Sequence, residues 1–187
     1  ISSSNLEEVA VHLNSILREI IDADSHLNLY LKPNLSQNER NRIDGLRTEL
    51  EELEASGCDE RITKNLNYSL EEVESHHYLA TAFISARVID HVIQLIKKEE
   101  KLGDENLNEE IIKRFKEIGV IKKEDEYAME TKKFFLDASK SSRDAISHKI
   151  DYFPNASESF SLLSYAFRIS NLLIKYEKLK NETTNNK

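Results

Sequence analysis

The sequence predicts an all-α protein, a helical bundle with an N-terminal antiparallel helical hairpin. Four Gly and two Pro in 187 residues are too few for the frequent turns of a β-sandwich or barrel. Apolar residues recur at three-four spacing, and no segment alternates with the period of two that marks a half-buried strand. A hydrophobic content of 39% beside 32% charged residues suits helices with one apolar and one solvated face.

The first two predicted helices form the hairpin, which we assign to a domain of residues 1–68. From Leu6 to Tyr30 the apolar positions alternate three and four apart, and Pro33 then ends the helix because it cannot continue the hydrogen-bond ladder. Ser36 and Glu39 form a capping box that opens the second helix. The apolar seam of that helix consists of Ile43, Leu46, Leu50 and Leu53.

A long, nearly all-apolar helix opens the second predicted domain, a helical bundle of residues 69–187. Ser69 and Glu72 form another capping box, which predicts a helix from there to about Glu100. Twelve of the eighteen residues at positions 79–96 are apolar, as in a buried central helix. Arg87 and Asp90 lie inside this run, three residues apart, so they can pair with each other. A buried charge needs a partner or a function, because an unpaired one costs several kcal/mol.

Three further helices complete the predicted bundle. A short helix over 108–118 ends at Gly119, and a longer one follows over 123–149. The chain breaks before Pro154, and a last helix is predicted over 157–179. Residues 181–187 are polar and predict a frayed tail.

The charge of the chain is distributed unevenly. A formal net charge of −8 argues against a general nucleic-acid-binding surface, which would be basic. Residues 1–68 hold 7 positive and 13 negative side chains, a net −6, so most of the acidity belongs to the predicted hairpin. Residues 131–149 hold 5 positive and 2 negative side chains, a net +3. The net charge of residues 131–149 is therefore opposite in sign to that of the chain, so the composition does not exclude a local basic binding site there.

Several chemistries lack their sequence signatures. Cys58 is the single cysteine, which excludes an intrachain disulfide and a cysteine-rich zinc site. Glu74-Ser75-His76-His77 holds one Glu-x-x-His unit, but a di-iron bundle needs two such units and two more glutamates. No run of 18 apolar residues and no signal peptide are present, so we expect a cytoplasmic protein that does not enter a membrane. No metal and no cofactor are expected.

The segment from Lys140 to Lys149 carries residue types that suit RNA cleavage. Attack of a ribose 2′-hydroxyl on the neighbouring phosphate needs proton transfer near neutral pH, where histidine titrates. A fixed positive charge beside the phosphorane is also needed, and a guanidinium supplies it without a metal ion. Arg143 and His148 are the candidates, and Lys140 and Lys149 add positive charge for RNA binding. The two candidates differ by about 140° on a regular helix, so they converge only if the helix ends near Ser147 or a second subunit supplies a matching pair.

This arrangement resembles the HEPN superfamily, the higher eukaryotes and prokaryotes nucleotide-binding domain. The likeness rests on Ala86-Arg87-x-x-Asp90 in the long apolar helix and on Arg143-Asp144-Ala145-Ile146-Ser147-His148 near the end of the penultimate helix. The second segment fits the Arg-x4-His form of the family motif. The likeness covers residues 69–180, about three-fifths of the chain. Residues 1–68 are not required by the family pattern.

The resemblance implies a metal-independent endoribonuclease that cleaves single-stranded RNA by 2′-hydroxyl transesterification. Its composite active site would lie at a homodimer interface, as in defence, toxin–antitoxin or stress systems. Arg143 would stabilise the phosphate, His148 would transfer a proton or orient the 2′-hydroxyl, and Asp144 would hold the arginine. Asp90, with Arg87, resembles the polar pair on the family's long helix and would support these residues.

The alternative is a non-catalytic module for nucleotide binding or for helical protein interactions. The hairpin seam would then bind a partner helix or complete a dimer. Such a module would function without Arg143 and His148, but would fail when Leu13, Ile16 or Leu46 is replaced by a charged residue.

Overall fold

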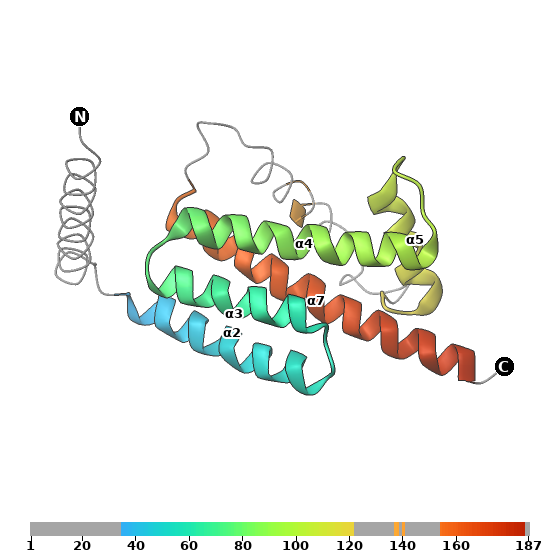
Figure 1. The fold of residues 1–187 in the computed structure, drawn as a ribbon, viewed down its shortest axis with the longest axis horizontal. Coiled ribbons are helices and arrows are strands. Elements are labelled where there is room, and N and C mark those ends of the chain that lie inside the picture. Colours follow the sequence, from blue (N-terminus) through green and yellow to red (C-terminus); the bar gives the residue numbers. More distant parts are fainter. Residues whose placement is uncertain (1–34, 122–136, 139, 141–153, 186–187) are drawn as a thin grey trace, which may run out of the picture. The chain divides into compact units, whose positions relative to one another are not determined.

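The computed structural model describes residues 35–121, 137–138, 140 and 154–185. The chain divides into two compact units, Ile1–Leu35 and Ser36–Lys187, and all five labelled helices belong to the second (Figure 1). Over these described ranges all regular structure is helical, which confirms the all-α class. The first predicted helix of the hairpin lies outside the described residues, so the hairpin itself stays a prediction.

Helix α2, Gln37–Ala55, begins and packs as the sequence predicts. The Ser36 hydroxyl accepts the Glu39 N–H at 3.3 Å, and the Glu39 carboxylate accepts the Ser36 N–H at 2.8 Å, which completes the capping box. The helix ends before Gly57, whose φ of +77° reverses the chain. All four residues of the predicted seam are buried: Ile43, Leu46, Leu50 and Leu53.

Helix α3, Glu60–Glu74, begins nine residues before the helix start predicted at Ser69, so that prediction is wrong. Asp59 is the true N-cap, and its carboxylate accepts the Arg61 N–H at 2.7 Å. Ser69 lies in mid-helix and is fully buried. Its hydroxyl bonds to Ser85 at 2.7 Å and to the Thr81 carbonyl at 3.1 Å. A tertiary partner thus uses the hydroxyl that the local pattern assigned to a cap.

The chain turns between α3 and α4, where the sequence predicted one continuous helix. His76 adopts a left-handed φ of +60°, and the His77 N–H donates to the Glu72 carbonyl at 2.8 Å. This pattern is a Schellman ending with histidine in the position that glycine usually takes. Helix α4, Tyr78–Glu100, then begins in the opposite direction.

The last two described helices begin within one residue of their predicted starts. Helix α5, Leu107–Ile118, ends at Gly119 with a φ of +86°. Helix α7, Ala156–Asn185, begins after Pro154, where the Asn155 side chain accepts the Glu158 N–H at 3.0 Å. The helix extends to Asn185 through residues that we expected to fray. Its last turns are anchored to α4 by Lys180, whose ammonium binds Glu100 at 2.7 Å.

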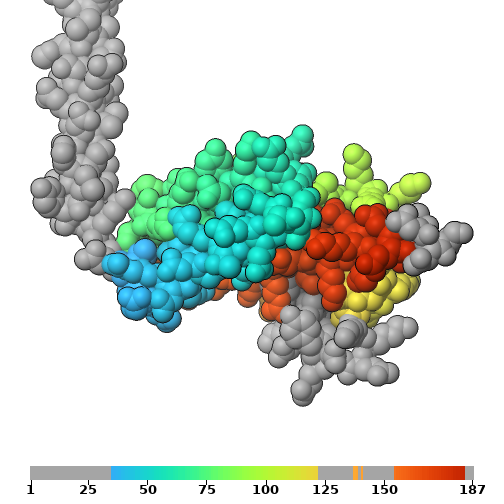
Figure 2. Space-filling model, turned by 90° about the horizontal axis from the view of Figure 1, so that it is seen from below, coloured from blue at the N-terminus to red at the C-terminus, as the bar shows by residue number. Residues whose placement is uncertain are grey.

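Helices α4 and α7 form the centre of the bundle (Figure 1). They share the most extensive contact in this unit, α3 packs on both, and α7 also contacts α2 and α5. Figure 2 shows the C-terminal part of α7, in red, exposed beside α2 and α3. Four aromatic side chains fill the core with almost no exposure: Phe115, Phe160, Phe167 and Tyr176. The described helices thus share one core, formed around α4 and α7.

Position 68, where we expected a domain boundary, lies inside α3. Because α3 packs on α2, α4 and α7, the chain on both sides of this position belongs to one compact unit from Ser36 onward. Among the described residues, α4 has the length and apolarity needed to cross a membrane. Half of its most apolar window is buried inside the bundle, and a core helix passes the same test.

Candidate functional site

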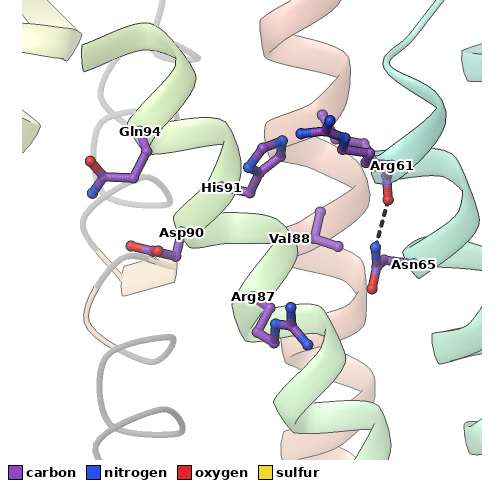
Figure 3. Close-up of a pocket in the computed structure, with 8 residues that line it drawn as sticks. Arg61, Asn65, Arg87, Val88, Asp90, His91 and Gln94 are labelled. Atoms are coloured by element: carbon purple, nitrogen blue, oxygen red, sulfur yellow. Dashed lines mark hydrogen bonds between the residues drawn. The ribbon is translucent and has the colours of Figure 1, made fainter. Parts of the chain in front are cut away.

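A polar cleft of about 370 Å³ opens between α3 and α4 (Figure 3). Both helices contribute charged side chains and amides around a small apolar surface. The lining residues are Arg61, Ile62 and Asn65 from α3 and Arg87, Val88, Asp90, His91 and Gln94 from α4. The cleft therefore offers two guanidinium groups, one imidazole, two amides and one carboxylate.

The helical period explains why these side chains meet. On α3, Ile62 and Leu66 face the core, which leaves Arg61 and Asn65, four residues apart, on the outer side. The Asn65 amide donates to the Arg61 carbonyl at 2.6 Å. On α4, Val88 and Val92 are buried, whereas Arg87, Asp90 and Gln94 are exposed and His91 is half-buried.

Arg87 and Asp90 differ from their predicted state. Both are exposed, whereas the apolar run suggested burial, and within the described part of the chain no ion pair joins them. Arg87 instead lies over the Phe83 ring, with its guanidinium carbon 6.0 Å from the ring centroid. The reason is that α4 keeps an outer stripe of residues 79, 83, 87, 90 and 94, and all five are exposed. Neither charge therefore requires the other.

His91 is the most unusual member of the cleft. Its Nε2 atom is buried and has no hydrogen-bond partner. Figure 3 shows the ring extending from α4 toward the Arg61 side chain on α3. A buried polar atom without a partner costs about 1–3 kcal/mol, so native structures seldom keep one without a reason. His91 is also one of the residues that line the cleft.

Two of the seven predicted site residues, Arg87 and Asp90, line this cleft, and their side chains extend to different sides of α4 (Figure 3). Lys140 is exposed on a helical turn whose neighbour Ala138 is completely buried. The four remaining residues, Arg143, Asp144, His148 and Lys149, lie outside the described residues. Their predicted convergence is therefore a proposal.

Four polar residues of the cleft were not predicted from the sequence: Arg61, Asn65, His91 and Gln94. His91 had a detectable signal, since Arg87 and His91 are four residues apart and share a face of the same predicted helix. No sequence signal places Arg61 and Asn65 of α3 in the cleft, because the predicted helix begins only at Ser69 and leaves residues 61 and 65 in a separate domain.

The Glu74 to His77 segment has structural partners. The Arg47 guanidinium donates two hydrogen bonds of 2.7 Å to the Glu74 carboxylate. His77 Nδ1 lies 2.6 Å from the Glu72 carboxylate. His76 Nδ1 lies 2.8 Å from the Tyr78 hydroxyl. Across the ranges for which side chains are described, no three His, Cys, Asp or Glu residues are grouped so that they could hold a metal ion.

A second polar cluster joins the ends of α4 and α7, and we name it the Glu100 cluster: Glu99, Glu100, Tyr176 and Lys180. The Tyr176 hydroxyl donates to Glu100, and the Lys180 ammonium binds Glu100 at 2.7 Å and Glu99 at 2.9 Å. Burial raises the pKa of Tyr176 to about 12, with its hydrogen bond to Glu100 adding to the effect. Because every member has a partner, this cluster stabilises the fold and leaves no group free for chemistry.

Cys58 has the environment of an unreactive thiol. Burial raises its pKa to about 11, and the negative charges of Glu177 and Asp59 act in the same direction. The thiolate is the reactive form of cysteine, so this residue is a poor nucleophile near neutral pH.

Comparison with protein-family models, with curated proteins and with solved structures finds no match to this chain.

Proposed function

We propose that this protein is a metal-independent endoribonuclease that acts on single-stranded RNA as a homodimer. The observation that carries the proposal is the segment from Arg143 to His148, an Arg-x4-His motif in a region of net positive charge within a chain of net charge −8. Its likeness to the HEPN motif suggests the reaction. The packing of the other described helices on α4 and α7 is compatible with a small helical bundle like that of the HEPN superfamily.

The reaction needs only groups that this segment supplies. The ribose 2′-oxygen attacks the adjacent phosphorus as its proton passes to a base, and the P–O5′ bond breaks as the 5′-oxygen takes up a proton. The products are a 2′,3′-cyclic phosphate and a free 5′-hydroxyl. His148 would transfer protons in this sequence, and Arg143 would stabilise the negative charge of the phosphorane. Asp144 would orient Arg143.

The described residues support this proposal in two ways. Arg87 and Asp90, the polar pair of the resemblance, lie on the exposed side of α4, where a substrate can reach them. The turn at residues 137–140 buries Ala138 and exposes Asp137 and Lys140, so the described residues just before the motif have one packed side and one charged side. Lys140 and Lys149 would bind the RNA backbone.

Purified protein should cleave single-stranded RNA in the presence of EDTA. Arg143→Ala and His148→Ala should each lower the rate by at least about hundredfold, as expected for loss of a group that acts in the transition state. Lys98→Gln is the control, because Lys98 is exposed on α4 outside the cleft. Equal cleavage rates in all three variants would show that Arg143 and His148 are not catalytic residues.

The homodimer has its own test. A composite site predicts that Arg143→Ala and His148→Ala subunits, both nearly inactive alone, recover activity when they are mixed and exchanged, because one site of the mixed dimer can combine intact residues from both. Activity of an isolated monomer at the wild-type level would contradict the composite site.

The alternative of a partner-binding hairpin seam is weakened by α2. Its apolar residues, among them Leu46 with 8% exposure, are buried within the unit that α2 forms with α3 and α7. A charge at Leu46 would therefore unfold the bundle before it blocked a partner. Leu13 and Ile16 lie outside the described residues and are the positions at which this alternative is best tested.

A further inference from the structure

We draw no further inference here: the strongest candidate, the polar cleft between α3 and α4, specifies no class of ligand, because the Arg87 guanidinium lies over the Phe83 ring rather than beside Arg61 and His91, and nothing in the structure shows what occupies the cleft.

Discussion

At the residue scale, His91 lowers the stability of the folded chain. Its buried Nε2 atom has no partner in the folded chain, so it lowers the free energy of unfolding. His91→Leu should therefore stabilise the protein by about 1 kcal/mol. Urea denaturation of the wild type and the variant measures the change in the free energy of unfolding. A loss of stability larger than about 1 kcal/mol would mean that the imidazole ring is needed for packing.

The Glu100 cluster makes stability depend on pH at both ends of the range. Burial opposes ionisation of Glu100, but hydrogen bonds from Lys180 and Tyr176 outweigh it and hold the pKa of this carboxyl below 4.5. Its contribution is present above pH 4.5 and is lost as the pH falls through the folded value. Burial raises the pKa of Tyr176 from 10.0 to about 12, so that contribution is present below pH 10 and is lost as the pH rises toward 12.

Tyr176→Phe tests the share of Tyr176 in the alkaline dependence, to which Lys180 also contributes, because its hydrogen bonds to Glu100 and Tyr176 outweigh burial and raise its pKa. The variant should lose about 1–2 kcal/mol at neutral pH, because Glu100 and Lys180 each lose a hydrogen-bond partner. It should also lose part of the decline between pH 10 and 12, while the acid decline remains. Unfolding free energies from urea titrations between about pH 3 and pH 11 test both statements. An unchanged alkaline profile would show that Tyr176 does not titrate with unfolding.

At the element scale, the two left-handed helix endings of α2 and α3 give a matched pair. Gly57 has a φ of +77° with open space where a Cβ atom would lie, so Gly57→Ala should cost about 1 kcal/mol through backbone strain alone. His76 has a φ of +60°, so His76→Gly should recover a similar amount, less the contact with Tyr78. Thermal unfolding measures both. A lower melting temperature for Gly57→Ala and a higher one for His76→Gly would support backbone strain as the cause. Destabilisation by both variants would contradict it.

The same two helix endings explain why the sequence predicts the end of α2 but not the end of α3. The end of α2 carries a glycine, and both its capping box and its seam are confirmed. The end of α3 carries His76 at the equivalent place, and histidine is not a stop signal. Ser69 and Glu72 matched a capping box by chance of spacing, because the sequence cannot show that Ser69 bonds to Ser85 on another helix.

The candidate site was predictable only in part, for a related reason. The sequence indicates Arg87 and Asp90 because charges stand out in an apolar run, yet the same run predicts a helix that is buried on nearly all sides. Arg61 could be placed beside them only after the turn at His76 was known, since this turn folds α3 back along α4. Long-range pairing of this kind depends on where a chain reverses, which local patterns fix poorly.

At the scale of the whole molecule, the proposed function predicts that the acidic charge limits where RNA binds. Helix α2 exposes Glu51, Glu52 and Glu54, whereas the cleft exposes Arg61 and Arg87. Replacing the three glutamates by glutamine should raise non-specific RNA affinity and flatten its dependence on target sequence, because repulsion of the phosphate backbone is reduced. Filter binding at two salt concentrations measures this. Unchanged affinity at low salt would show that the acidity has no role in RNA selection.

Cleavage of RNA by the 2′-hydroxyl without a metal ion is the reaction that we propose for this protein. Its most direct measurement is mass spectrometry of the ends that the full chain produces from a single-stranded RNA in EDTA, for the wild type and His148→Ala. We expect 2′,3′-cyclic phosphate and 5′-hydroxyl ends from the wild type, and almost none from the variant. Products with 5′-phosphate ends, or the same products in equal yield from His148→Ala, would contradict it.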